Sequence, residues 1–131
     1  MKSVVWNIQD EWQPLEAVMV GIGVGMGPAP QLPDTYDPQS RKHVQQGTYP
    51  HESDVTRELD ALAAALVAHG VQVKRPESLG FNQVFARDIG VVIDGAFVMT
   101  SMVEDRAQER AGIDRMLEGN PSTVHRPPND V

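Results

Sequence analysis

The most regular apolar segment of the chain lies at 81–99 and reads FNQVFARDIGVVIDGAFVM. Within it, Asp94-Gly95 separates two apolar runs, and this dipeptide is typical of a two-residue hairpin turn between antiparallel strands. Arg87 and Asp88 are the charged residues that interrupt the first run. The pattern therefore predicts two buried antiparallel strands, with a charged pair inside the first.

The position of Asp88 within this apolar run needs an explanation. Side chains alternate along a strand, so an extended backbone here would place Asp88 on one face with Gly90 and Val92, and Arg87 on the other face. Gly90 would then leave empty space beside the carboxylate. Because a buried carboxylate needs a partner, two interpretations stay open. Asp88 either forms a structural ion pair with Arg87 or with another group of the chain, or it binds a cationic ligand.

Further elements are predicted before the hairpin. Residues 14–21 form a short apolar run that ends at a glycine, as expected for a buried strand. The next segment, 21–52, is rich in glycine and proline and has no apolar period, so we expect a long loop. Apolar residues spaced by three and four over 54–69 predict an amphipathic helix capped by Gly70, and a strand follows at 71–74.

A second helix and strand follow the hairpin, and they repeat the first pair. Ser101-x-x-Glu104 has the form of a capping box before a helical pattern over 102–117, and a short strand is expected at 122–126. The halves match at a constant offset of 51 residues: Glu58 with Glu109, Leu66 with Leu117, Val73 with Val124, and Arg75 with Arg126. The sequence thus predicts one domain over 1–131, with repeats at about 14–76 and 82–127.

Composition narrows the classes of function. The chain has 131 residues, a net charge of −7 and no cysteine. Without a Lys/Arg cluster, nucleic acid is not expected as a partner. No apolar run is long enough for a bilayer and the start lacks a signal-peptide pattern, so we expect no membrane partner and a cytoplasmic protein. The lack of cysteine removes disulfides, thiolate metal sites and the commonest strong nucleophile.

Three short motifs carry a family resemblance. They are Glu11-Trp12-x-Pro14-Leu15-Glu16-x-Val18-x-Val20-Gly21, then Gly70-Val71-x-Val73-x-Arg75-Pro76, and then Asn82-x-x-Phe85-x-Arg87-Asp88, with Arg106-x-x-Glu109 further on. In this order they resemble the N-terminal part of the guanidino-group-modifying (pentein) superfamily, above all the amidinotransferases and more distantly the arginine deiminases and dimethylarginine hydrolases. The resemblance implies an α/β fold: a propeller of five ββαβ units, of which about two are present here as a partial propeller with small mixed sheets.

The resemblance also implies roles for individual residues. Asp88 matches the carboxylate that holds the substrate guanidinium at the catalytic centre, and Asn82 and Phe85 match substrate-pocket residues. Arg87 and Gly90 would have structural or orienting roles. The family reaction proceeds by attack of a cysteine on the guanidinium carbon, with a histidine as general acid and base, so it implies no metal and no cofactor. Since this chain has no cysteine and its histidines lie outside the matching context, we expect the isolated chain to be inactive.

Two hypotheses for function follow from these observations. In the first, the chain is the N-terminal, guanidinium-binding part of an amidinotransferase-like enzyme acting on arginine or a related guanidine. In the second, it is a non-catalytic binding or assembly module derived from the same fold. Two repeats of a closed propeller leave unpaired strand edges, so both hypotheses predict a homo-oligomer or association with a complementary C-terminal part.

Overall fold

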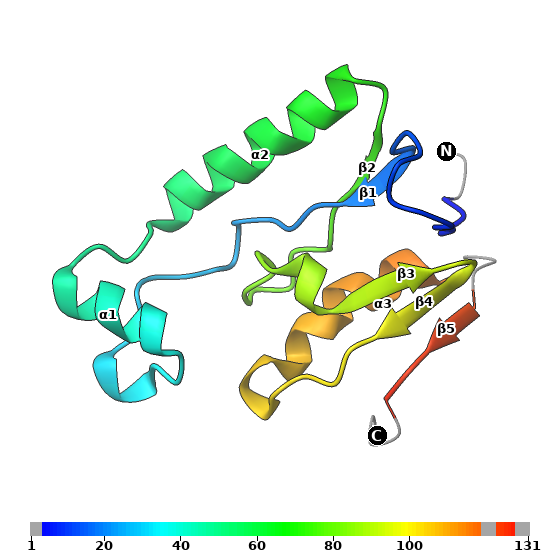
Figure 1. The fold of residues 1–131 in the computed structure, drawn as a ribbon. Helices are drawn as coiled ribbons and strands as arrows, with labels where there is room; N and C mark the ends of the chain where they lie inside the picture. The colour runs from blue at the N-terminus through cyan, green and yellow to red at the C-terminus, as the bar shows by residue number, and fades with distance from the viewer. Residues whose placement is uncertain (1–3, 119–122, 128–131) are drawn as a thin grey trace.

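The computed structural model describes residues 4–118 and 123–127, and within them the chain forms a mixed α/β fold with two small sheets (Figure 1). In the two-stranded sheet, β1 (Ala17–Met19) pairs in parallel with β2 (Gln72–Lys74). In the three-stranded sheet, β4 (Ala96–Met99) lies between β3 (Gly90–Ile93), its antiparallel partner, and β5 (Thr123–His125), its parallel partner.

Three α-helices accompany these strands in the described part of the chain. They are α1 (Pro38–Gln46), α2 (Glu52–Ala68) and α3 (Ala111–Leu117). In Figure 1, the C-terminal end of α2 leads through a turn into β2, while α3 lies behind the three-stranded sheet. Across the described residues, no helix combines the length and the apolar character that a membrane span requires.

The hairpin predicted around Asp94-Gly95 is confirmed. Residues Gly90 to Ile93 pair in register with Met99 to Ala96, and Asp94 takes the positive φ of 49° that the turn requires. The prediction that both strands are buried is wrong for β3, because Val91 and Ile93 are 50% and 55% exposed. Ile113 and Leu117 of α3 pack with Phe97 and Met99 of β4, whereas Val91 and Ile93 of β3 stay half exposed.

The strand assignment of Asp88 is wrong. Residues Ala86–Asp88 form a turn of 3₁₀-helix that ends before β3 begins, so the alternation of a strand does not apply to Arg87 and Asp88. The expected empty space beside Gly90 is also absent. A Cβ atom at Gly90 would lie 2.4 Å from Cε1 of Phe97, because the buried Phe97 ring fills that volume. Gly90 therefore permits close packing in the core and does not open a cavity.

Gly90→Ala is expected to lower the free energy of unfolding by about 1–3 kcal/mol, because the added methyl group overpacks the core against the Phe97 ring. Gly95→Ala is the matched control, since a Cβ atom there meets no atom within 4 Å. Urea unfolding of both variants measures the difference. Equal stability of the two variants would contradict the tight packing at Gly90.

The long loop predicted for 21–52 contains a helix that the apolar pattern missed. In α1 no residue is buried, so the helix has no apolar stripe for sequence analysis to find. Its ends are fixed by capping instead. The Asp37 carboxylate accepts a hydrogen bond from the Ser40 N–H at 2.7 Å, Pro38 occupies the first turn, and Gly47 ends the helix with a left-handed φ of 66°.

The predicted second helix starts differently from the expectation. Val103, and not Ser101, precedes the first helical residue, and its side chain makes no capping hydrogen bond, so the capping-box prediction is wrong. The segment begins as a 3₁₀-helix over Glu104–Arg110 and continues as α3. Ile113 and Leu117 of α3 then pack into the core with Phe97, Met99 and Trp6.

The two halves of the chain share an element order. In each, a strand is followed by a helical segment and then by a strand parallel to the first, and β2 and β5 begin 51 residues apart. Arg75 and Arg126, which follow these strands, each reach back to an aspartate of the preceding helix. Their guanidinium groups lie 3.0 Å from the Asp60 carboxylate and 2.5 Å from the Asp114 carboxylate, respectively.

Candidate functional site

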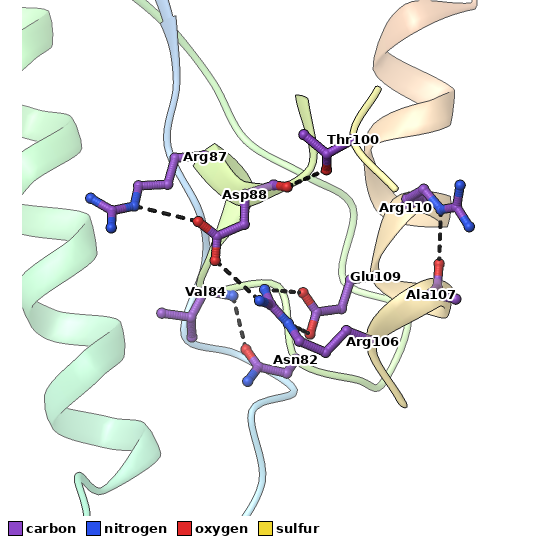
Figure 2. Close-up of polar contacts among 9 residues, drawn as sticks. All are labelled: Asn82, Val84, Arg87, Asp88, Thr100, Arg106, Ala107, Glu109 and Arg110. Atoms are coloured by element: carbon purple, nitrogen blue, oxygen red, sulfur yellow. Dashed lines mark hydrogen bonds and ion pairs between the residues drawn. The ribbon is translucent and has the colours of Figure 1, made fainter. Parts of the chain in front are cut away.

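Asp88 is held by its backbone at the junction between the 3₁₀ turn and β3. Its N–H donates to the Phe85 carbonyl at 3.0 Å, which closes the turn. Its carbonyl accepts a hydrogen bond from the hydroxyl of Thr100, just after β4 (Figure 2). The backbone is thus fixed on both sides, while the side-chain carboxylate stays 38% exposed. The carboxylate is available for interactions with other groups.

Arg106 occupies one side of this carboxylate. Its Nη1 donates to Asp88 Oδ2 at 3.1 Å, while Nε and Nη2 donate to the two oxygens of Glu109 at 2.9 and 2.8 Å (Figure 2). Arg106 and Glu109 are three residues apart in the 3₁₀-helix, so they face the same side. Hydrogen bonding to Glu109, and then to Asp88, raises the pKa of Arg106 although burial opposes this. The group therefore stays cationic.

Arg87 approaches the other oxygen of Asp88 but holds it weakly. Its Nε lies 3.5 Å from Oδ1, and 91% of its side chain is exposed. Figure 2 shows it extending away from Arg106, beyond the opposite oxygen of the carboxylate. An exposed pair of this kind contributes little stability. One of the two interpretations left open by the sequence was an ion pair of Asp88 with Arg87 or another group of the chain; the structure shows contacts with both arginines, and Arg106 is the closer partner.

Asn82 and Phe85 lie beside the same ion pair. The Phe85 ring centroid is 5.4 Å from the Arg106 guanidinium carbon, which is within the range of a cation–π contact. The Asn82 side chain accepts a hydrogen bond from the Val84 N–H at 3.0 Å through its carbonyl oxygen. That bond leaves the amide NH₂ group of Asn82 as the donor for other partners.

A cavity of about 360 Å³ brings these side chains together. One wall consists of Asn82, Phe85, Asp88, Arg106 and Glu109. This volume is in the range of small-molecule sites. The structure therefore brings three of the predicted site residues, Asn82, Phe85 and Asp88, to one cavity, whereas Arg87 and Gly90 are not among the lining residues.

The rest of the cavity lining comes mainly from the segment that was predicted to be a loop. Asp34, Tyr36, Asp37 and Tyr49 line the cavity from the 3₁₀ turn Leu32–Asp34 and from both ends of α1. Burial raises the pKa of the Tyr36 phenol, so the phenol is a protonated hydrogen-bond donor near neutral pH. Hydrogen bonds from Ser40 lower the pKa of Asp37, so its carboxylate stays ionised.

Sequence analysis did not assign site roles to Arg106 and Glu109, although they form part of the family motif. Their i, i+3 spacing in a predicted helix is compatible with an ordinary surface ion pair, and nothing in the sequence indicates that Glu109 is only 5% exposed. The sequence analysis also missed the part of the cavity lining that comes from residues 34–49, because it did not predict α1. The Asp37-Pro38-x-Ser40 pattern, an N-cap followed by proline at the first helical position, was the available signal.

Comparisons with known proteins identify related folds. No protein-family model and no curated protein matches the chain. Among solved structures, inosamine-phosphate amidinotransferase of Streptomyces griseus matches with a TM-score of 0.67 and 26% identity, over 97% of this chain and 44% of that one. An amidinotransferase of the saxitoxin biosynthetic pathway of Microseira wollei matches with a TM-score of 0.74 and 20% identity, over 95% and 42%.

The chain therefore spans less than half the length of these two structures. The resemblance to amidinotransferases that the sequence motifs indicate is confirmed, since almost the whole chain superposes on amidinotransferase structures. The mixed α/β class with small sheets is confirmed as well.

Proposed function

We propose, from this amidinotransferase-like fold, that the chain is the N-terminal, guanidinium-binding part of an enzyme of the amidinotransferase type, acting on arginine or a related guanidine. One observation carries the proposal. The Asp88 carboxylate faces a cavity of small-molecule size and already accepts a hydrogen bond from a guanidinium group, that of Arg106. A ligand guanidinium would use the same chemistry on the rest of the carboxylate.

The carboxylate has room for such a ligand. A carboxylate offers about four acceptor positions, and the contacts with Arg106 and Arg87 use two of them. A planar guanidinium binds a carboxylate through parallel hydrogen bonds, and it can displace the exposed Arg87 side chain from Oδ1 at low cost. Arg106, bound to Glu109 at both oxygens, would keep Asp88 in place meanwhile. Asn82 and Phe85 would contact the ligand from the same wall.

The chemistry of transfer requires more than these residues provide. A covalent mechanism needs a cysteine to attack the guanidinium carbon, and the 131 residues contain none. We therefore assign Asp88 a role in binding and orienting the guanidinium. A fixed carboxylate does this by holding the guanidinium carbon in line for attack by the nucleophile. We also propose that the two strand–helix–strand segments are units of an α/β propeller that further segments complete.

An NMR titration tests the binding function. We expect n-butylguanidine to shift the amide signals of the cavity wall, residues 82–88 and 106–109. The control is n-pentylamine, a cation of similar length that lacks the planar donor set, and we expect it to leave these signals in place. Shifts of equal size with both compounds, or shifts confined to other parts of the chain, would refute guanidinium recognition at this cavity.

The second hypothesis, a binding or assembly module, is favoured by half-exposed apolar residues on β3. Val91 and Ile93 on β3 are half exposed in the described chain, although they belong to an apolar strand. Contiguous exposed apolar surface serves as an interface in many proteins. Association through this face is compatible with the guanidinium site, because neither residue lines the cavity.

We predict that the isolated chain self-associates through this face. Light scattering should give a mass above that of one chain, and Val91→Lys should shift the equilibrium toward the monomer, because a buried lysine would be left without a partner. Leu62→Lys on α2 is the matched control, since Leu62 and Val91 are both 50% exposed. A monomeric wild-type chain, or equal effects of the two substitutions, would contradict this interface.

A further inference from the structure

Thr100 holds the backbone that carries the Asp88 carboxylate. Its N–H donates to the Ile89 carbonyl at 2.9 Å, and its hydroxyl donates to the carbonyl of the preceding residue, Asp88 (Figure 2). One residue just after β4 therefore binds two consecutive carbonyl groups of the segment before β3. Thr100 and Asp88 are 12 positions apart in the sequence, so this contact forms only in the folded chain.

The contact lies where the hydrogen-bond ladder between β3 and β4 ends. The register of the two strands places Ile89 opposite Thr100, and the Thr100 N–H supplies the next bond of the ladder. The Ile89 N–H, however, donates to the Ala86 carbonyl at 3.2 Å and closes the 3₁₀ turn. Threonine hydroxyls can bind backbone groups in place of sheet partners. The Thr100 hydroxyl thus binds the Asp88 carbonyl at the point where the chain changes from turn to strand.

The peptide group between Asp88 and Ile89 is held at both of its polar atoms. Its carbonyl accepts from Thr100, and its N–H donates to Ala86. Because a peptide group is planar, fixing both atoms fixes its rotation, and with it the direction in which the Asp88 side chain leaves the backbone. That side chain lines the cavity and accepts from Arg106 at 3.1 Å. The Thr100 hydroxyl therefore contributes to the placement of the carboxylate.

We infer that Thr100 is a positioning residue of the guanidinium site, and that its hydroxyl keeps the Asp88 carboxylate directed into the cavity. The inference rests on the guanidinium-binding function proposed above. It goes beyond that function, because Thr100 belongs neither to the sequence motifs nor to the residues that line the cavity in the described chain. Thr100 acts through the backbone of Asp88 and not by contact with the ligand.

Thr100→Val keeps the β-branched shape and the backbone N–H but removes the hydroxyl donor. By calorimetric titration of the 131-residue chain with agmatine, a small guanidine, we expect this variant to bind about tenfold more weakly, the equivalent of one hydrogen bond to a charged group. Thr100→Ser keeps the donor and should bind within about twofold of the wild-type chain. Thr56→Val on α2 is the matched control, since Thr56 is partly buried like Thr100 and lies outside the cavity lining.

The serine variant separates positioning from stability. Thr100→Ser loses a methyl group and its packing, so a purely structural role predicts affinities that follow the stabilities of the two variants, measured by urea unfolding. Positioning by the hydroxyl predicts that Thr100→Val loses affinity and Thr100→Ser does not. Wild-type affinity of Thr100→Val, or an equal loss in both variants, would overturn the inference and leave guanidinium binding standing.

Amide hydrogen exchange followed by NMR gives a second readout, which needs no ligand. The Asp88 and Ile89 amides donate to the carbonyls of the 3₁₀ turn, and we expect them to exchange about fivefold faster in Thr100→Val, the effect of one lost hydrogen bond. Amides within β4 should keep their wild-type rates. Unchanged rates at Asp88 and Ile89, or equal acceleration throughout β4, would contradict local positioning. If the wild-type chain binds no agmatine, the guanidinium site itself is refuted and the inference falls with it.

Discussion

Asp88→Asn is expected to weaken guanidine binding by about 100-fold, because truncating one partner of a hydrogen-bonded charge pair costs about 3 kcal/mol once the ligand has covered the pair. Asparagine keeps the size of the side chain but replaces one accepting oxygen with a donor directed at the cation. Arg106 could still donate to the remaining oxygen, but one of its two negatively charged partners would be lost. Calorimetric titration of both chains with agmatine measures the loss.

The same substitution should change stability much less than binding. In the free chain the Asp88 carboxylate is 38% exposed and makes one contact with each of two arginines, so we expect a loss of about 1 kcal/mol in the free energy of unfolding. Asp54→Asn, which breaks an exposed pair with Arg57, is the control for the loss of one surface charge. If Asp88 is instead a purely structural partner of Arg106, Asp88→Asn will lower the melting temperature and leave the affinity for agmatine unchanged.

Arg106→Met is the substitution for which we expect the largest loss of stability, about 3–5 kcal/mol in the free energy of unfolding. The Glu109 side chain is 7% exposed and both of its oxygens accept from Arg106, so removal of the arginine leaves a buried carboxylate without compensation. Urea unfolding monitored by circular dichroism measures the change. A loss below about 1 kcal/mol would show that solvent reaches Glu109 and that the ion pair is not buried.

Two further variants isolate the cause. Arg115→Met breaks a pair with Glu77 of similar distance, 2.8 Å, whose side chains are 63% and 42% exposed, so it should cost less than about 1 kcal/mol. The double variant Arg106→Met with Glu109→Met removes both charges, and it should recover much of the stability lost by Arg106→Met alone. Failure to recover would indicate that packing of the arginine stem, and not the stranded charge, accounts for the loss.

The elements that depend on local pattern could be predicted from the sequence. The hairpin followed from Asp94-Gly95 between apolar runs, and the helix before Gly70 followed from its apolar spacing. The parallel partners β2 and β5 lie where the 51-residue offset places them. For the hairpin and the helix, the signal and the structure depend on residues close to one another in the sequence.

Features that depend on capping or on tertiary contacts could not be predicted in the same way. Helix α1 has no apolar stripe, and it is fixed by Asp37 and Gly47 at its ends. The turn at 86–88 interrupts a run that reads as a strand, because Phe85 and Ala86 accept backbone hydrogen bonds from Asp88 and Ile89. Such competition between a tight turn and a strand is decided by packing beyond the local sequence.

The family resemblance named some of the residues that line the cavity, but not their arrangement. The resemblance named Asn82, Phe85 and Asp88, which line one cavity. It did not reveal that Arg106 holds Asp88, since residues 18 positions apart meet only through the fold. The part of the lining from residues 34–37 was likewise hidden, because these residues reach the cavity through a segment that looked irregular.

The most direct test of guanidinium binding is a crystal structure of the chain with bound agmatine. We expect the ligand guanidinium in the cavity lined by Asn82 and Phe85, with nitrogen atoms about 2.7–2.9 Å from the Asp88 carboxylate oxygens, the spacing of a charge-assisted hydrogen bond. The Arg87 side chain should have left Oδ1, and the pair between Arg106 and Glu109 should be unchanged. Agmatine bound at another surface, or a cavity without ligand while Asp88 keeps both arginine contacts, would contradict the role assigned to Asp88.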